Sequence, residues 1–399
     1  MTSASPERRT NAPRRSAVRV VLGALSLACC AAACGATPTR TPTPWSVEVP
    51  SPVGGSAIAI DDGGLFVLVA DVDEDAALES DASTRSVLRR HDLWTGDAVA
   101  TLDVPEGLNA DQLAGMSATD GLVIAWTNTA VAWFDAAGTS APRFAGDQPC
   151  GTAPVEVVAT RTTAAVRCAN GSTWASAGDT WTEFTAGDTS ALRVAAHRDR
   201  IFVLTTREED FDVALDVRVL TGPDAPDDPT WSGPLFDPPS AIEVHGGRLY
   251  ARIDDYRLSS RRLADGRGVR EIEAAPSAAS HLGGWYVGRD VRTGQVLRMH
   301  RVRAWELDAA DPTWTTWLPV GAVDRVVASL GNDGVVVEGG GIATLLDRTT
   351  GDVVWTVEIP EDDDGSCQTL GASRAGFVRR CLRDDGIGVV VHSLAPTDG

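Results

Sequence analysis

A short phrase recurs along the chain at a nearly constant interval, and this period restricts the fold more than any other feature. The clearest copy begins at Asp347 and reads Asp-Arg-Thr-Thr-Gly-Asp-Val-Val-Trp, and a second copy begins at Asp92. Successive turns of this kind are 40 to 45 residues apart, near Gly96, Gly138, Gly178, Gly222, Gly266, Asp311 and Gly351. A period of this length, filled by short strands, predicts a β-propeller.

Each repeat contains two kinds of turn. The first kind joins the first strand to the second and is rich in Gly, Asp and Asn, which tolerate the positive φ of tight hairpins. Eight such turns occur, near residues 61–64, 119–121, 161–163, 197–199, 245–247, 282–284, 332–334 and 373–376. The second kind is the Asp-x-x-Thr-Gly turn, which we expect between the third and fourth strands. The tryptophan after it is expected to pack on the neighbouring blade.

The two ends of the repeat region are complementary. The eighth repeat ends with the strand 388–392, without room for a fourth strand, while the segment 45–50 is a near-copy of 355–360. We therefore predict an all-β, eight-bladed β-propeller of four-stranded antiparallel blades over residues 45–399. In this prediction the N-terminal strand closes the ring and hides two sheet edges. Seven blades are the alternative, if the Thr-rich third repeat belongs to a neighbour.

Residues 1–33 have the pattern of a targeting segment and are left out of the fold. Five arginines precede an apolar stretch, 20–33, that is shorter than the roughly 20 residues needed to span a bilayer. The stretch ends in Ala-Ala-Ala-Cys, which resembles the lipobox of bacterial lipoproteins and predicts lipidation at Cys34. Cys29 and Cys30 are alternative cleavage points, an ordinary secretory signal is a second alternative, and Arg14-Arg15 leaves twin-arginine export open.

The segment 34–44 is rich in Thr and Pro and predicts an extended linker. The whole chain has a net charge of −20 and no lysine, and its Ala-, Asp- and Arg-rich usage is typical of a high-GC bacterial genome. Without residues 1–33 the net charge becomes −24, which argues against a nucleic-acid partner and against electrostatic attraction to anionic lipid. We expect a monomer held on the extracytoplasmic side of the cell membrane by acyl chains.

Four cysteines remain beyond the lipidation site. Cys150 and Cys168 bracket the first hairpin of the third repeat, and Cys367 and Cys381 bracket the same hairpin of the eighth. Equivalent placement in two repeats predicts the disulfides Cys150–Cys168 and Cys367–Cys381, which an exported protein can form. Four buried free thiols are the alternative.

The repeat around Asp347 and Trp355 resembles that of the PQQ-like, or quinoprotein-like, β-propeller family. This family includes quinone-dependent enzymes and cofactor-free lipoproteins. The resemblance implies a quinone only if the rest of the cofactor site is present. The enzymes carry a vicinal Cys-Cys disulfide, and the only vicinal pair here is Cys29-Cys30, inside the targeting segment. We therefore expect no cofactor, because a fold alone does not carry a function.

Three histidines are the sharpest candidate for a metal site. His197, His245 and His281 each precede an aromatic residue by five positions, which suggests equivalent places in three adjacent repeats. Three imidazoles would suit a divalent metal, and three polar turn residues facing water are the alternative. Together these features predict a binding or scaffolding module for protein or glycan partners, with no catalysis. A metal-assisted polysaccharide lyase or hydrolase is the alternative function.

Overall fold

The computed structural model describes residues from 42 to 394, and statements about structure below concern these residues. Undescribed within this range are 51–57, 62, 72–84, 120, 178–179, 185–190, 210–211, 221–228, 236–241, 246, 253–256, 274–279, 283–284, 294–297, 307–310, 320–324, 328–333, 360–366 and 384–385. The expected targeting segment, the lipidation site Cys34 and the vicinal pair Cys29-Cys30 lie outside the described residues, so these predictions stay predictions.

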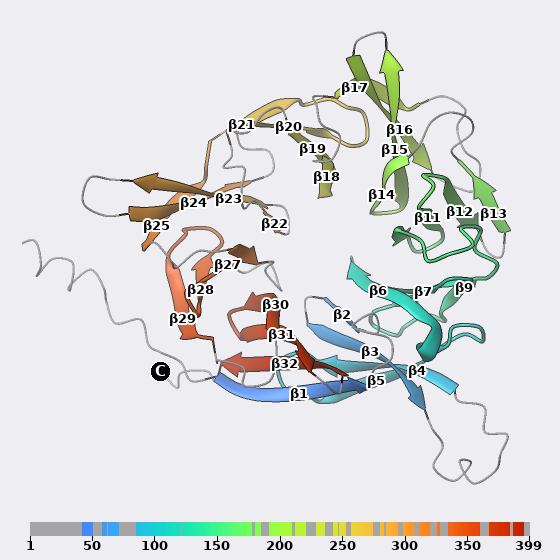
Figure 1. Ribbon diagram of the computed structural model, residues 1–399, viewed down its shortest axis with the longest axis horizontal. Coiled ribbons are helices and arrows are strands. Elements are labelled where there is room, and N and C mark those ends of the chain that lie inside the picture. Colours follow the sequence, from blue (N-terminus) through green and yellow to red (C-terminus); the bar gives the residue numbers. More distant parts are fainter. Residues whose placement is uncertain are drawn as a thin grey trace, which may run out of the picture. The chain divides into compact units, whose positions relative to one another are not determined.

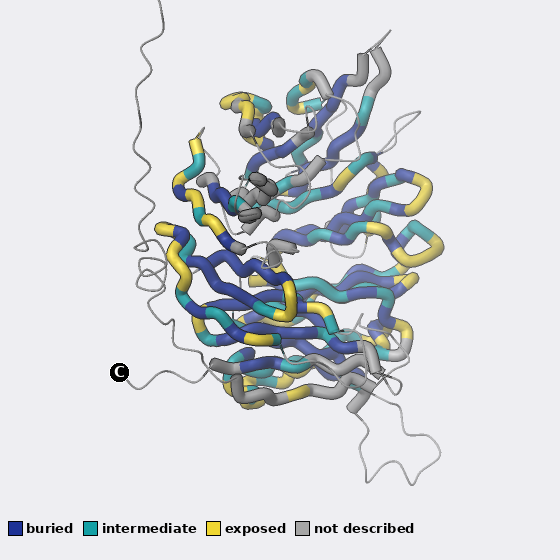
Figure 2. The backbone as a smooth tube through the Cα atoms, turned by 60° about the vertical axis from the view of Figure 1, so that its left-hand side comes forward, coloured by how far each residue is buried: buried dark blue, intermediate teal, exposed yellow. Residues whose placement is uncertain are grey.

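Short apolar runs bounded by turn residues form the strands. The second strand of a repeat is the most buried, as in the run Leu65–Leu68, whose residues are at most 2% exposed. Such runs bury both faces because each sheet is covered by a neighbouring sheet on either side. Buried positions therefore follow the strands, while exposed positions gather at the turns between them (Figure 2).

The described residues form eight four-stranded antiparallel sheets (Figure 1). The first four sheets, in chain order, contain β2 (Ile58–Ile60), β3 (Gly64–Asp71), β4 (Arg85–Asp92) and β5 (Ala98–Asp103); β6 (Leu113–Thr119), β7 (Leu122–Thr127), β8 (Val131–Asp135) and β9 (Arg143–Ala145); β10 (Glu156–Ala159), β11 (Ala164–Arg167), β12 (Thr173–Ala177) and β13 (Thr180–Glu183); and β14 (Ala191–His197), β15 (Arg200–Glu209), β16 (Asp212–Leu220) and β17 (Trp231–Leu235). A 3-10 turn, η2 (Ala110–Gln112), precedes β6.

The last four sheets continue the same pattern. They contain β18 (Ile242–His245), β19 (Arg248–Arg252), β20 (Arg257–Arg262) and β21 (Arg270–Glu273); β22 (Ser280–Leu282), β23 (Trp285–Thr293), β24 (Arg298–Glu306) and β25 (Trp314–Pro319); β26 (Arg325–Val327), β27 (Gly334–Gly339), β28 (Ile342–Asp347) and β29 (Val353–Glu358); and β30 (Cys367–Ser373), β31 (Gly376–Arg383) and β32 (Gly386–Leu394) with β1 (Pro42–Pro50). In the described part of the chain, no helix is long and apolar enough to cross a membrane.

Among the described residues, apolar clusters of buried side chains join seven pairs of neighbouring sheets. Separate apolar clusters link the second sheet to the third, the third to the fourth, the fourth to the fifth, the sixth to the seventh and the seventh to the eighth. One further cluster joins the first sheet both to the second and, through Val378 and Val391, to the eighth. Four-stranded meanders that follow one another along the chain and pack face to face build a β-propeller.

The N-terminal strand completes the eighth sheet, as the repeated sequence predicts. β1 pairs antiparallel with β32 in an unbroken register from Pro42↔Leu394 to Pro50↔Gly386, and it is the outer strand of the order β1-β32-β31-β30 (Figure 1). The strand begins three residues before the expected start at residue 45, so part of the predicted 34–44 linker is sheet. Prolines 42, 44 and 50 explain why this is possible, because an edge strand accepts proline where its N–H would face away from the partner.

The Asp-x-x-Thr-Gly turn lies between the third and fourth strands, as expected. In the copy between β28 and β29, Oδ1 of Asp347 accepts hydrogen bonds from the backbone N–H groups of Thr349 (2.8 Å) and Thr350 (3.0 Å). Gly351 has φ +77°, and its N–H donates to the Asp347 carbonyl (2.9 Å). Asp92 accepts from Thr95 N–H (2.8 Å) in the same way. The aspartate and glycine are therefore requirements of the turn itself.

Tryptophans connect these turns to neighbouring sheets. Trp355 is fully buried, packs with Phe377 in the cluster between the seventh and eighth sheets, and donates from Nε1 to the Ser373 carbonyl (3.2 Å). The predicted packing on the neighbour is confirmed. The two Asp-Pro-Thr-Trp phrases, at 228–231 and 311–314, also begin fourth strands with their tryptophans. Trp314 donates to the Arg348 carbonyl (2.6 Å), and Trp231 donates to the Leu263 carbonyl (2.7 Å).

The two predicted disulfides are present. Cys150–Cys168 closes the β10–β11 hairpin of the third sheet, with Cα atoms 5.2 Å apart. Cys367–Cys381 joins two residues that face each other across β30 and β31, with Cα atoms 4.0 Å apart. Each disulfide links the first two strands of one sheet. In the chain-entropy model, closing a loop of this size with a disulfide adds about 3 kcal/mol to the free energy of unfolding.

Candidate functional site

The three histidines do not occupy equivalent register positions. His197 pairs with Arg200, and His245 pairs with Arg248, so each closes the two-residue turn after a first strand. His281 instead pairs with Tyr286, one position further from its turn, which is closed by Leu282 and Trp285. The expectation of three equivalent places is therefore wrong for His281. A constant spacing to an aromatic residue does not fix a hairpin's register.

His197 lies against the next sheet. A Cβ atom on Gly247, in the β18–β19 turn, would be 2.7 Å from Nε2 of His197. Among the described residues there is no group of three or more His, Cys, Asp or Glu side chains arranged to hold a metal ion. The side chains of His245 and His281 are outside this description, so the metal site stays a prediction.

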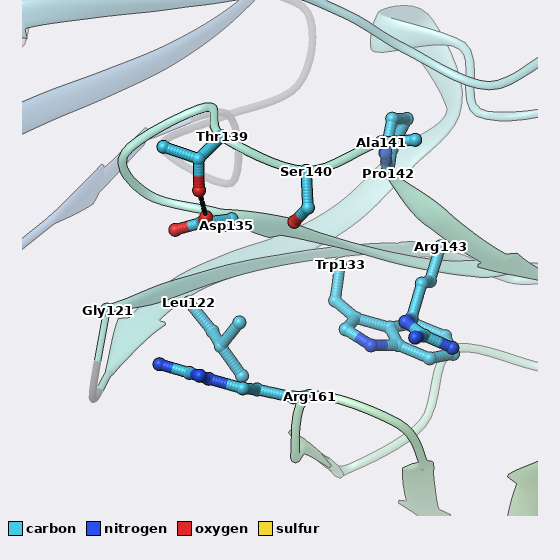
Figure 3. A pocket seen from close by; sticks show the side chains of 10 residues that line it. All are labelled: Gly121, Leu122, Trp133, Asp135, Thr139, Ser140, Ala141, Pro142, Arg143 and Arg161. Atoms are coloured by element: carbon cyan, nitrogen blue, oxygen red, sulfur yellow. Dashed lines mark hydrogen bonds between the residues drawn. The ribbon is translucent and has the colours of Figure 1, made fainter.

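A pocket of about 720 Å³ lies between the second and third sheets. This volume is within the range of about 300–1,000 Å³ typical of small-molecule sites. Its wall comes from the turn before β7, from β8 and the β8–β9 connection, and from the β10–β11 turn (Figure 3). The lining residues are Gly121, Leu122, Trp133, Asp135, Thr139, Ser140, Ala141, Pro142, Arg143 and Arg161.

Trp133 carries an unsatisfied hydrogen-bond donor at this pocket. Its indole is 3% exposed and belongs to the apolar cluster between the second and third sheets, with neighbours such as Ile124 and Val166. Its Nε1–H is buried and has no hydrogen-bond partner. Burying a donor without an acceptor costs about 1–3 kcal/mol.

Two arginines from different sheets line the same pocket. Arg143 begins β9 and stands opposite Trp133 in the β8–β9 register, so the two side chains project from the same face of the sheet. Arg161 comes from the β10–β11 turn of the third sheet. That turn is held by Thr160, whose N–H donates to the Thr163 carbonyl (2.8 Å) and whose Oγ1 accepts from Thr163 N–H (3.2 Å). The turn fixes the backbone from which Arg161 extends.

Asp135 supplies the pocket's negative charge. It ends β8, where Oδ1 accepts from Ala137 N–H (3.1 Å) and Oδ2 accepts from the Thr139 hydroxyl (Figure 3). The Thr139 hydrogen bond is the main cause that lowers the pKa of Asp135 below its ordinary value of 3.8, and the charge of Arg161 adds to this effect. The carboxylate is therefore a fixed negative charge near neutral pH, and it is poorly suited to donate a proton as a general acid.

The lining thus combines two cations, one anion, an indole donor and the hydroxyls of Thr139 and Ser140. Two arginines against one aspartate leave a net positive lining within a chain of net charge −20. Such a set can bind a polar, anionic group by charge-assisted hydrogen bonds. The sequence shows the Asp135–Gly138 turn as a weak copy of the repeated phrase, but no sequence signal places Trp133 beside Arg161.

The sequence matches no protein-family model and no curated protein sequence. Several solved structures are similar to it in fold. They include the C-terminal WD40 domain of Sif2 (12% identity, TM-score 0.48, 89% of this chain and 99% of that one) and the Dos1 propeller (11%, 0.47, 90% and 96%). A quinohemoprotein alcohol dehydrogenase of Pseudomonas putida HK5 is similar at 10% identity and a TM-score of 0.45, over 89% and 76% of the two chains. At these values the similarities carry no information about activity.

Proposed function

We propose that this chain is a lipid-anchored, extracytoplasmic, eight-bladed β-propeller that binds glycan or protein partners at the cell envelope. The observation that carries the binding role is the pocket between the second and third sheets, with its buried indole donor and its two arginines. Its lining side chains come from turns on a scaffold of paired strands. Binding residues on turns held by a rigid sheet scaffold are typical of recognition proteins.

The eight-bladed, closed form of this proposal rests on two observations. The described residues form eight four-stranded sheets, and one apolar cluster spans the eighth, first and second sheets. The pairing of β1 with β32 supplies the fourth strand that the last repeat lacks. This pairing covers the edge of β32, and exposed sheet edges promote aggregation.

The proposed location is supported by the sequence and by the disulfides. The two disulfides are of a kind that persists in oxidising compartments outside the cytosol. The Ala-Ala-Ala-Cys sequence ending at Cys34 and the Thr- and Pro-rich residues after it fit an acylated N-terminus and a spacer. The acyl chains would then hold the protein at the membrane.

Labelling with an alkyne-bearing fatty acid in living cells tests the anchor. We expect the wild-type chain and the control variant Cys29→Ala to be labelled and to fractionate with membranes. The variant Cys34→Ala is expected to lose the label and to leave the membrane fraction. Unchanged labelling of Cys34→Ala, or no labelling of the wild type, would refute the anchor at Cys34.

A photo-crosslinking amino acid at the pocket tests the binding role. Placed at Ser140 in intact cells, it is expected to capture one dominant partner, glycan or protein. The control position is Val353, which is 39% exposed on the seventh sheet, away from the pocket. Absence of a product at Ser140, or the same product at both positions, would contradict binding at this site.

A further inference from the structure

We propose that the pocket between the second and third sheets binds a carboxylate-bearing sugar, of the uronic-acid class. This inference rests on the binding function proposed above and names its ligand chemistry. It follows from three features of the lining: two arginines from different sheets, an aspartate held by its own turn, and a buried donor with no partner. Each feature selects part of the ligand.

The arginines select an anionic group. Arg143 and Arg161 enter the pocket from two different sheets, and a guanidinium binds a carboxylate through two parallel hydrogen bonds. Both are exposed enough to reach a ligand from solution.

Asp135 selects a ligand that carries hydrogen-bond donors as well as an anion. Its carboxylate remains ionised, because the Thr139 hydroxyl and Arg161 lower its pKa. A phosphate or sulfate ion brings two negative charges near neutral pH and few or no donors, so it would meet repulsion at Asp135. A uronic acid has its single carboxylate at one carbon and hydroxyl donors around the ring. It can satisfy the arginines and the aspartate together.

Trp133 brings a buried hydrogen-bond donor to the lining of the pocket. Its indole Nε1–H is buried and lacks a partner, whereas a sugar hydroxyl or ring oxygen provides an acceptor. Its ring belongs to the apolar cluster between the two sheets, so it offers no open face for a sugar ring to stack on. This geometry favours a ligand recognised by hydrogen bonds.

Titration calorimetry with the purified full chain tests the proposal. The probes are a disaccharide that contains glucuronate, the matched neutral glucose disaccharide, and inorganic phosphate. We expect the glucuronate disaccharide to bind and the other two to bind at least tenfold more weakly. Arg143→Gln and Arg161→Gln are each expected to raise its Kd about tenfold or more, because each removes charge-assisted hydrogen bonds. Arg267→Gln, an exposed arginine of the fifth sheet, is the matched control and should leave the Kd unchanged.

Trp133→Phe separates recognition from packing. It keeps an aromatic ring in the apolar cluster but removes the N–H and part of the buried ring, so we expect a severalfold higher Kd together with a lower Tm from lost packing. A merely structural role of Trp133 would lower the Tm and leave the Kd unchanged. Equal binding of the neutral sugar, tighter binding of phosphate, or no glucuronate binding would overturn the proposal. If Ser140 still captures a partner in cells, such a result would leave the broader binding function standing.

Discussion

Glycines at the repeated turn are required for two separate reasons. Gly351 adopts φ +77°, which costs an L residue about 1–2 kcal/mol. It also lies under the indole of Trp314 from the preceding sheet, where an added Cβ would be 2.6 Å from Cε3. Gly341 has the same φ of +77° but has no atom within 4 Å of an added Cβ. The two glycines therefore separate conformational strain from steric exclusion.

We expect Gly351→Ala to lower the free energy of unfolding by about 2–4 kcal/mol, because strain and overpacking add. Gly341→Ala is the matched control and should cost only about 1–2 kcal/mol, from strain alone. Urea denaturation of both variants, compared with wild type, measures the difference. If the free energy of unfolding fell equally in the two variants, the contact with Trp314 would make no contribution to stability.

Three turn aspartates predict how stability depends on pH. Backbone hydrogen bonds, from Thr95 and Thr349 respectively, are the main causes that lower the pKa of Asp92 and Asp347, and the Thr139 hydroxyl is the main cause for Asp135. A lowered folded-state pKa contributes stability above the unfolded value of 3.8, and that stability is lost as pH falls through the folded-state pKa.

We therefore expect the Tm to fall below about pH 4, and this fall to be smaller in a variant with Asn at all three positions. Asparagine can accept the same turn hydrogen bonds but does not titrate. Calorimetric scans from pH 7 to pH 2 measure the effect, with Asp97→Asn and Asp352→Asn as controls beside the same turns. A triple variant whose Tm falls as steeply as that of wild type would contradict this account.

At the scale of elements, the joints between sheets are made by tryptophans that begin fourth strands. Trp314 begins β25 and donates to the carbonyl of Arg348 in the turn between β28 and β29 (2.6 Å), and Trp231 makes the equivalent bond to Leu263 (2.7 Å). In both cases the acceptor lies three residues before the turn glycine. Between the first and second sheets, the side chain that lies against the turn glycine, Gly138, is that of Leu102 and not a tryptophan. The joint therefore accepts an apolar side chain without a donor.

Trp314→Phe isolates the hydrogen bond of one joint. We expect it to lower the free energy of unfolding by about 1–3 kcal/mol, because it leaves the Arg348 carbonyl without its donor and removes part of the buried ring. Trp317→Phe in the same strand is the control, since Trp317 is 48% exposed, and should change stability by less than about 0.5 kcal/mol. Chemical denaturation measures both. A similar loss in the two variants would count against the joint.

The turns and strands could be predicted from the sequence because their causes are local. The pocket between the second and third sheets could not be predicted. A turn that needs aspartate to accept two backbone N–H groups, and glycine for a positive φ, leaves a repeated mark in the sequence. The near-copy of 355–360 at 45–50 likewise predicts the pairing of β1. Trp133 and Arg161 line the same pocket only because two sheets lie next to each other, and no local pattern records that packing. The register of His281 depends on where its hairpin turns, which spacing to Tyr286 does not determine.

At the scale of the whole molecule, the eighth sheet is built from both ends of the described chain. The prolines of β1 show how an edge strand is adapted to this role. Successive residues of an antiparallel strand point their N–H groups alternately toward and away from the partner. Prolines 42, 44 and 50 are separated by even numbers of residues, so all three positions have the same orientation in the strand. In the observed register, each can therefore occupy a position whose N–H would face away from β32.

This alternation predicts opposite outcomes for two neighbouring substitutions. Glu48→Pro adds a proline on the same alternation and should be tolerated, with a loss below about 1 kcal/mol. Val47→Pro removes an N–H that faces β32 and should cost at least about 1–2 kcal/mol more, with a rise in aggregation as the edge of β32 opens. Thermal unfolding and light scattering measure both effects. If Glu48→Pro were the more damaging of the two, the assigned alternation would be wrong.

The pairing of Pro42 with Leu394 joins residues 352 positions apart, and this has a consequence for the order of events during synthesis. Among the described strands, β1 is synthesised first and its partner β32 last. Each other sheet can assemble from a contiguous stretch of chain as it emerges, whereas the eighth must wait for residues of both ends. Non-local pairing of this kind is slow to form, because a long loop must close, at a cost in chain entropy, before the two strands gain their contacts. A chain cut short before β32 would leave β1 without this partner, so the eighth sheet forms only after the strands of the other seven sheets have been made.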